Sequence, residues 1–128
     1  MEYIPYVEWD VLSDEEFVIW LAEQDAELRR EVAAYGALLK QYGPMLGRPR
    51  VDTVKGSKFP NMKELRIQWM GQPWRILFAF DPKRRSILLI GGNKQADKRW
   101  YDKNIPIADA RFAKHLKEME KKNGNKIR

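Results

Sequence analysis

Residues 63–80 read Lys-Glu-Leu-Arg-Ile-Gln-Trp-Met-Gly-Gln-Pro-Trp-Arg-Ile-Leu-Phe-Ala-Phe, and this stretch decides the fold. Apolar and polar side chains alternate over 63–69 and again over 74–80, which is the period of a β-strand. The Met-Gly-Gln-Pro sequence between the two runs predicts a turn. The stretch therefore predicts a β-hairpin that has one apolar face and places Arg66 and Arg75 together on the other.

Two arginines inside strands need an explanation, because a buried guanidinium is costly unless its face meets solvent or an anion. Pairing of the two tryptophans that flank the turn makes Arg66 and Arg75 diagonal neighbours, within reach of a common phosphate. The alternative is an ordinary ion pair with Glu64 or Asp10. The hairpin is thus a candidate anion-binding surface.

Upstream of the hairpin, the sequence predicts one strand and two helices. Residues 6–11 alternate as a short strand does. Ser13 and Glu16 form a capping box that opens the first helix. The second helix occupies 26–42, with apolar residues along one face, and ends at Gly43-Pro44. We expect the two helices to form an αα-hairpin with an acidic outer face.

The segments beside and after the hairpin are predicted from their glycines, prolines and apolar runs. Residues 46–61 are rich in Gly and Pro and are expected to be mostly loop. A continuous apolar run over 86–90 predicts a central strand buried on both faces, which ends at Gly91-Gly92. Helical segments are predicted over 93–103 and 107–122.

The whole chain, 1–128, is predicted to be one α+β domain: a small antiparallel sheet with helices against one face, an N-terminal αα-hairpin and a C-terminal helix. Residues 123–128 are expected to be a flexible tail. There is no cysteine, which excludes a disulfide framework and a structural zinc site. The first residues lack the pattern of a secretory signal, and no apolar stretch approaches the ~20 residues that span a bilayer. We therefore expect a cytoplasmic protein with no membrane partner.

Charge is segregated along the chain. Residues 1–47 contain three Lys/Arg and ten Asp/Glu, a formal charge of −7, whereas residues 48–128 contain 21 and eight, a formal charge of +13. A solvated lysine-rich surface is the simpler interpretation, but it does not explain cations within strand patterns. A directional field of this kind attracts a polyanion to one part of the surface.

Aromatic residues accompany the cations after the last predicted strand, and this combination favours RNA, whose phosphates need cations and whose bases stack on rings. Of Trp100 and Tyr101, helical spacing turns one inward and leaves the other available. The candidate RNA-binding residues outside the hairpin are Arg48, Lys58, Lys98, Arg99, Trp100 and Lys103.

His115 is the only histidine and is predicted to be an ordinary surface residue of the last helix. We find no Ser-His-Asp set, no metal-ligand pattern and no glycine-rich nucleotide loop. No metal or cofactor is therefore expected.

Five stretches carry a family pattern: 46–49, 54–57, 62–66, 74–80 and 88–94. They resemble the RelE/HigB toxins of bacterial type II toxin–antitoxin systems, specifically the phage-Gp49-like HigB branch. The most specific part is the pair of strands with Glu-Leu-Arg and Trp-Arg-Ile-Leu-Phe. The short apolar strand that leads into Gly-Gly-Asn-Lys supports it.

The resemblance implies a microbial RNase fold and an endoribonuclease that cleaves mRNA, commonly on the translating ribosome, and so inhibits translation and growth. It also implies a cognate helix-turn-helix antitoxin that neutralises the toxin. By position, Arg75 and Lys94 match basic residues of the family, and Tyr101, or Trp100 one position off, matches its aromatic residue near the last helix. We hypothesise that Arg75 binds the scissile phosphate, that Lys94 and Lys55 stabilise charge, and that Tyr101 transfers a proton or stacks a base. Arg66 matches the common strand arginine. Some relatives carry a histidine in the loop and another in the last strand, and this sequence has neither.

Two other functions are open at this point. One is a ParE-like toxin that inhibits DNA gyrase on the same fold, and the other is a non-catalytic RNA-binding module. Two antitoxin contacts are also compatible with the sequence: an acidic segment or a capping helix that covers the basic face, or binding to the acidic αα-hairpin.

Overall fold

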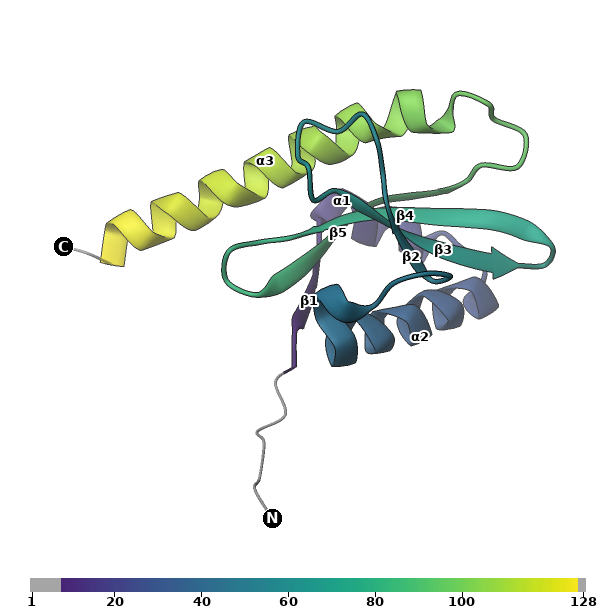
Figure 1. Cartoon of the computed structure of the whole chain (residues 1–128), viewed down its shortest axis with the longest axis horizontal. Coiled ribbons are helices and arrows are strands. Elements are labelled where there is room, and N and C mark those ends of the chain that lie inside the picture. Colours follow the sequence, from purple (N-terminus) through teal and green to yellow (C-terminus); the bar gives the residue numbers. More distant parts are fainter. Residues whose placement is uncertain (1–7, 127–128) are drawn as a thin grey trace, which may run out of the picture.

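A five-stranded sheet in the order β1-β5-β4-β3-β2 forms the centre of the fold (Figure 1). The computed structural model describes the backbone of residues 8–126 and the side chains of 8–122. The predicted α+β class is confirmed. The strands are β1 (Asp10–Ser13), β2 (Val51–Thr53), β3 (Lys63–Trp69), β4 (Gln72–Phe80) and β5 (Arg85–Asn93). The helices are α1 (Glu15–Ala22), α2 (Ala26–Tyr42), the short 3-10 helix η1 (Gly43–Met45) and α3 (Trp100–Lys126).

The sheet is mixed, which corrects the predicted antiparallel sheet. Strands β2 to β5 pair antiparallel in chain order, but β1 pairs parallel with β5, with Asp10 opposite Arg85. An alternating pattern shows that a strand exists and does not show its partner, so the sequence left the direction of β1 open. The strand predicted over 6–11 begins only at Asp10 and continues to Ser13. Residues 6 and 7 lie outside the described residues.

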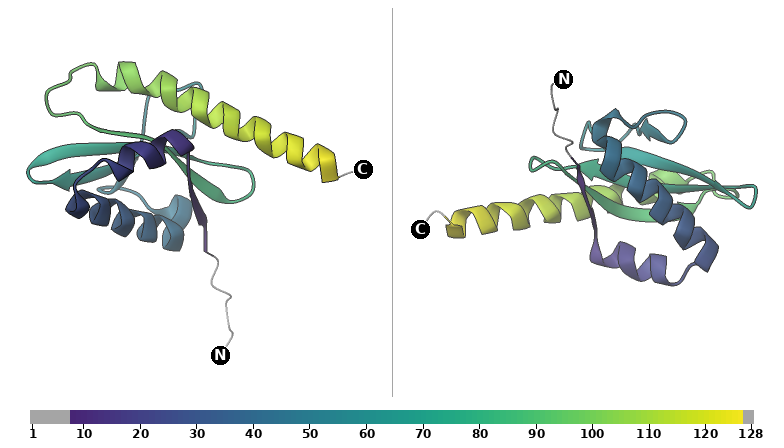
Figure 2. Two further views of the ribbon diagram at one scale, coloured as in Figure 1. Left: turned by 180° about the vertical axis from the view of Figure 1, so that it is seen from behind. Right: turned by 90° about the horizontal axis from the view of Figure 1, so that it is seen from below.

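Helices cover both faces of the sheet, not one face as predicted (Figures 1 and 2). α1 and α2 pack on one face and α3 packs on the other. Strands β4 and β5 carry apolar residues at both parities because they are buried on both sides. The core below α1 and α2 includes Phe17, Leu28, Leu39, Ile67, Ile76 and Phe78. The core below α3 includes Leu77, Ala79, Leu89, Trp100, Ala108 and Phe112.

The first helix begins one residue later than predicted. Ser13 still pairs with β5, and the Asp14 side chain is the cap that accepts from the Glu16 N–H at 2.9 Å. The second helix is confirmed at its predicted bounds, and Gly43 ends it with a φ of 54°.

The β3–β4 turn is tighter than predicted. It consists of Met70 and Gly71, whose φ angles of 52° and 70° suit a two-residue hairpin. The flanking tryptophans are therefore not paired, and Arg66 lies directly opposite Arg75. The prediction that the two arginines share a face is confirmed, and their diagonal arrangement is wrong.

Two segments are more regular than predicted. The segment predicted as loop over 46–61 contains β2, which pairs with the first half of β3. Strand β5 continues through Gly91 and Gly92 instead of ending there. A Cβ at Gly91 would lie 2.5 Å from the Trp20 ring, and one at Gly92 would lie 2.5 Å from Trp100 Nε1. These glycines therefore allow close packing within a strand.

The last helix is one element. The helix predicted over 93–103 begins only at Trp100, because Asp97 forms the turn before it and accepts from the Arg99 N–H at 3.0 Å. α3 continues through Pro106, since the residues on both sides pack in one core. The tail predicted over 123–128 is helical up to Lys126, and its last two residues lie outside the described residues. Within residues 8–126, no helix has both the length and the apolar character needed to cross a membrane.

His115 is not the ordinary surface residue that the sequence predicts. Its Nε2 lies 2.8 Å from Oδ2 of Asp81, a fully buried carboxylate that Arg85 Nε also contacts at 2.8 Å. Burial raises the pKa of Asp81, but hydrogen bonds from His115 and Arg85 outweigh it and leave the pKa lowered. This cluster ties the β4–β5 turn to α3. The partners are 34 residues apart, so no local pattern shows them.

Candidate functional site

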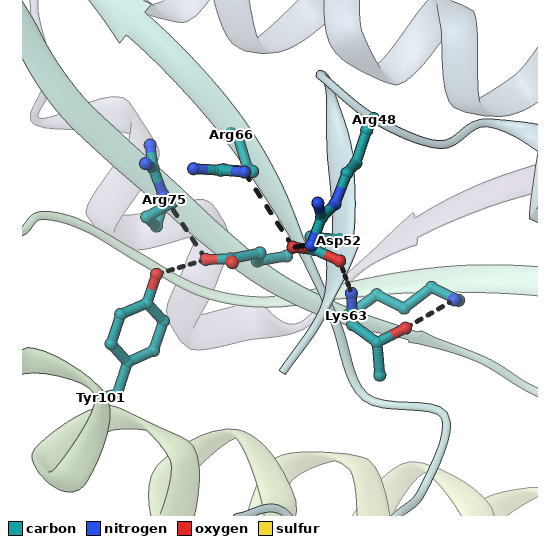
Figure 3. Close-up of polar contacts among 8 residues, drawn as sticks. Arg48, Asp52, Lys63, Arg66, Arg75 and Tyr101 are labelled. Carbon is teal, nitrogen blue, oxygen red and sulfur yellow. Dashed lines mark hydrogen bonds and ion pairs between the residues drawn. The ribbon is translucent and has the colours of Figure 1, made fainter. Parts of the chain in front are cut away.

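Three side chains from three elements meet at one end of the sheet (Figure 3). The Tyr101 hydroxyl at the start of α3 donates to Glu64 Oε1 in β3 at 2.5 Å, and Arg75 Nε in β4 lies 3.5 Å from the same oxygen. Glu64 is 7% exposed and Arg75 is 5% exposed. We call this set the Glu64 cluster. It brings an anion, a cation and a hydroxyl into contact at the rim of the core.

The local structure explains the convergence. Strand alternation puts Glu64, Arg66 and Gln68 on the face that also carries Arg75. On α3, Trp100 enters the core, and Tyr101 follows it one position on and contacts Glu64. The candidate functional face is therefore the α3 side of β3 and β4.

Tyr101 is a proton donor in this environment. Burial raises its pKa to about 12, with the hydrogen bond and charge of Glu64 adding to the effect and Arg75 opposing it. The hydroxyl thus keeps its proton at neutral pH and donates to the carboxylate.

Arg75 is incompletely satisfied. Its Nη1 donates to the Trp74 carbonyl at 3.0 Å, whereas its Nε has no hydrogen bond despite its proximity to Glu64. Among the described residues, the other buried side-chain polar atom without a hydrogen bond is Trp74 Nε1. Buried donors are usually paired, so an unpaired guanidinium N–H marks a strained or functional position.

A more exposed charge group lies beside the Glu64 cluster (Figure 3). Asp52 Oδ2 lies 3.0 Å from Arg48 Nη2 and 4.0 Å from Arg66 Nη1. The hydrogen bond from Arg48 is the main cause of the lowered pKa of Asp52. The Arg66 side chain remains 38% exposed, so it can contact a ligand as well as Asp52.

Lys94 also lies beside this group of predicted catalytic residues. Its Nζ lies 5.5 Å from the centroid of the Tyr101 ring, and its backbone N–H donates to Pro73 at 3.1 Å. The structure therefore brings together Arg75, Arg66, Lys94 and Tyr101.

The other predicted residues are peripheral. Lys55 and Lys58 are exposed on the loop after β2, which α3 holds through Asp109: this carboxylate accepts from the Lys58 N–H at 2.9 Å. Lys98, Arg99 and Lys103 are exposed around the start of α3. Arg99 contacts Asp102 at 3.8 Å, and Lys103 contacts Asp97 at 3.2 Å.

Trp100 requires a correction. It is 5% exposed, packs in the α3 core and has its Nε1 against Gly92, so its ring is not available to stack on a base. Tyr101 is the partly accessible member of the pair. Helical spacing predicted that one of the two turns inward, and only the packing shows which.

Sequence reasoning missed part of this site. It treated Glu64 only as an ion-pair partner, although the residue shares the strand parity of Arg66. It assigned no role to Arg50 or Gln68. Both line a pocket of about 350 Å³ beside Arg66, whose walls are Tyr35, Pro49, Arg50, Arg66, Gln68 and Arg75. We call this the β3-edge pocket.

A second pocket, of about 340 Å³, lies at the opposite end of the sheet beside His115. Two of its cations already have carboxylate partners, because Arg85 contacts Asp81 and Arg111 contacts Asp14. Among the side chains of residues 8–122, no group of three or more His, Asp or Glu is placed to hold a metal ion.

The fold is that of the RelE class of toxins. A solved structure of a double mutant of the E. coli toxin RelE in the free state matches with a TM-score of 0.53 at 11% identity. The match covers 71% of this chain and 88% of that one.

Sequence comparison narrows the class to a family. The model of the family "Phage derived protein Gp49-like (DUF891)" matches residues 19–113. The chain is 53% identical over 93 residues to "Putative toxin HigB3" of Mycobacterium tuberculosis (strain ATCC 25618 / H37Rv), covering 72% of this chain and 80% of that protein. It is 48% identical over 103 residues to "Putative toxin HigB2" of the same strain, covering 79% of this chain and 51% of that protein. The chain belongs to the Gp49-like family and is a HigB/RelE-type toxin of a toxin–antitoxin system.

Proposed function

We propose that this toxin is a metal-independent endoribonuclease that cleaves mRNA, and that a cognate helix-turn-helix antitoxin neutralises it. The observation that carries the proposal is the Glu64 cluster: a nearly buried carboxylate held by Tyr101 and Arg75, with Arg66 and Lys94 beside it. Acid–base groups next to cations are what RNA cleavage requires.

The reaction needs no nucleophile from the protein. The ribose 2′-OH attacks the adjacent phosphorus, the new P–O2′ bond forms, and the P–O5′ bond breaks. The products are a 2′,3′-cyclic phosphate and a 5′-hydroxyl. In our proposal Glu64 accepts the proton of the 2′-OH and Lys94 donates a proton to the departing oxygen.

The remaining groups orient the Glu64 carboxylate or stabilise the charge on the phosphate. Arg66 and Arg75 stabilise the charge that grows on the phosphate oxygens, and Lys55 adds charge from its loop. Tyr101 holds the Glu64 carboxylate through its hydrogen bond, because its raised pKa keeps the hydroxyl protonated.

In our proposal the RNA is cleaved while it is bound to the ribosome, because Arg75 is only 5% exposed. A substrate held in place by the ribosome supplies the alignment that a nearly closed site does not impose on free RNA. The antitoxin either covers the basic face with an acidic segment or binds the α1–α2 layer, where Val18 and Ile19 are 51% and 55% exposed.

Mapping of RNA 5′ ends after brief induction tests the function. We expect new 5′ ends within coding regions for the wild-type chain. Glu64→Gln removes the charge but keeps the shape and should reduce cleavage by about 10²–10⁴-fold, the usual contribution of a general base.

Two controls make the result interpretable. Glu120→Gln changes an exposed carboxylate of α3 and should cleave like the wild type. Thermal melting of both variants checks that they fold. Intact transcripts together with DNA damage would contradict the proposal and favour gyrase inhibition, and salt-sensitive RNA binding without cleavage or growth arrest would favour a binding module.

A further inference from the structure

We propose that the β3-edge pocket binds the nucleotide on the 3′ side of the cut and reads its base, with Gln68 and Tyr35 contacting the base and Arg50 and Arg66 the phosphate. The identity of the ligand as RNA rests on the proposed function. The existence of the pocket does not depend on that function, because it follows from how β3 packs.

The pocket exists because the sheet edge is open there. Strand β2 pairs only with Lys63, Glu64 and Leu65, and one further backbone bond joins the Arg66 N–H to the Arg50 carbonyl at 2.8 Å. Beyond that bond, no strand among the described residues covers the outer edge of β3. Pro49 and Arg50, which precede β2, and Tyr35 of α2 also line the pocket.

The lining is chemically suited to a nucleotide. Guanidinium groups bind phosphate, a side-chain amide both donates to and accepts from a base edge, and a phenol ring provides a stacking surface. A volume of about 350 Å³ lies near the lower end of small-ligand sites, which suits one nucleotide rather than several.

The key polar groups are available. Among the described residues, the side chains of Arg50 and Gln68 and the Tyr35 hydroxyl have no hydrogen bond or ion pair, and both Arg50 and Gln68 are exposed. Arg66 has only the 4.0 Å contact with Asp52, which a phosphate can replace with a shorter one. The Gln68 amide is therefore exposed at the wall of a cationic pocket, where a ligand can reach it.

The order of side chains along β3 matches the order of groups in the substrate. Glu64, Arg66 and Gln68 point to one face, and strand geometry separates successive members by about 7 Å. A phosphate at Arg66 therefore has the 2′-OH of the preceding ribose on the Glu64 side. The base of the following nucleotide lies on the Gln68 side.

NMR titration of the full chain tests base recognition without any cleavage. The probes are inorganic phosphate and the four nucleoside 5′-monophosphates. We expect at least one nucleotide to bind about tenfold more tightly than inorganic phosphate, the size of one good base contact, with shifts at Arg50, Arg66 and Gln68. Equal affinity for phosphate and all four nucleotides, or shifts confined to other residues, would overturn the proposal.

The matched variants are Gln68→Ala and Gln95→Ala, both at exposed glutamines. Gln68→Ala should remove most of the preference among the nucleotides and leave phosphate affinity within about threefold. Gln95→Ala should retain the preference. A preference that survives in Gln68→Ala contradicts the assignment of this residue.

An RNA-cleavage assay distinguishes a failure of the pocket proposal from a failure of the nuclease proposal. In the 5′-end maps, Gln68→Ala should cleave but accept more bases on the 3′ side of the cut. If the wild type cleaves and Gln68→Ala leaves the base pattern unchanged, only the pocket assignment fails. If no RNA is cleaved but nucleotides still bind with a preference that depends on Gln68, only the nuclease proposal fails.

Discussion

One carboxylate oxygen of Glu64, Oε1, contacts both a cation, Arg75, and a hydroxyl group, that of Tyr101. The Arg75 guanidinium lies 3.5 Å from this oxygen, and the Tyr101 hydroxyl donates to it at 2.5 Å. The hydroxyl keeps its own proton because it is buried and faces the charge of Glu64. A fully buried carboxylate with one cation partner would be a structural ion pair. The hydroxyl and the neighbouring pocket are what distinguish this position.

Replacement of Tyr101 by Phe should make the free energy of unfolding less dependent on pH above pH 10. The folded-state pKa of Tyr101 is about 12, above its usual value of 10.0. Its raised pKa therefore contributes stability that is fully present below pH 10 and is lost as pH rises towards 12. We expect the wild type to lose more unfolding free energy than Tyr101→Phe between those values in urea titrations. Parallel losses in the two proteins would contradict the raised pKa of Tyr101.

Strand β5 shows how an element is shaped by what packs on it. Gly91 faces Trp20 of α1 and Gly92 faces Trp100 of α3, so consecutive glycines admit one large ring on each side of the sheet. The sequence suggests a strand end at this pair, because glycine usually interrupts strands. The neighbouring tryptophans, distant in sequence, make the glycines part of the strand.

Two alanine substitutions should have opposite effects. Gly92→Ala places a methyl group against the buried Trp100 ring and should lower the free energy of unfolding by about 1–3 kcal/mol. Gly36→Ala in α2 meets nothing within 4 Å and should raise it by about 0.5–1 kcal/mol, because it restricts the unfolded chain. Urea unfolding followed by tryptophan fluorescence measures both. A neutral Gly92→Ala would contradict the tight packing.

At the scale of the whole molecule, acidic and basic residues are concentrated in different layers. The acidic first third of the chain forms β1 and the α1–α2 layer, and the basic remainder forms β2 to β5 and the α3 layer (Figure 2). The two layers therefore present different fields to a partner. A polyanion is attracted to the side of the sheet where the Glu64 cluster lies.

Binding of single-stranded RNA should depend steeply on salt. Neutralisation of about four phosphates gives a log–log slope of about −3, or roughly a 50-fold loss of affinity from 50 to 200 mM salt. Arg66→Gln should reduce the slope by about 0.7. Arg30→Gln removes an exposed cation of α2 and should leave the slope unchanged. Equal effects of the two variants would show that RNA does not select the α3 face.

The sequence by itself determined several of the elements and the shared face of the two arginines. The bounds of α2, the existence of the β3–β4 hairpin and the shared face of Arg66 and Arg75 follow from periodicity and turn chemistry, which are local. The resemblance to the Gp49-like HigB branch is also carried by short stretches of sequence.

Only the tertiary structure decided which residues meet. Tyr101 contacts Glu64, His115 contacts Asp81, and Trp100 rather than Tyr101 enters the core. The parallel pairing of β1 with β5 and the packing of helices on both faces of the sheet were also decided only by the tertiary structure. Contacts between residues about 35 positions apart depend on how whole elements pack, and no local period encodes that packing.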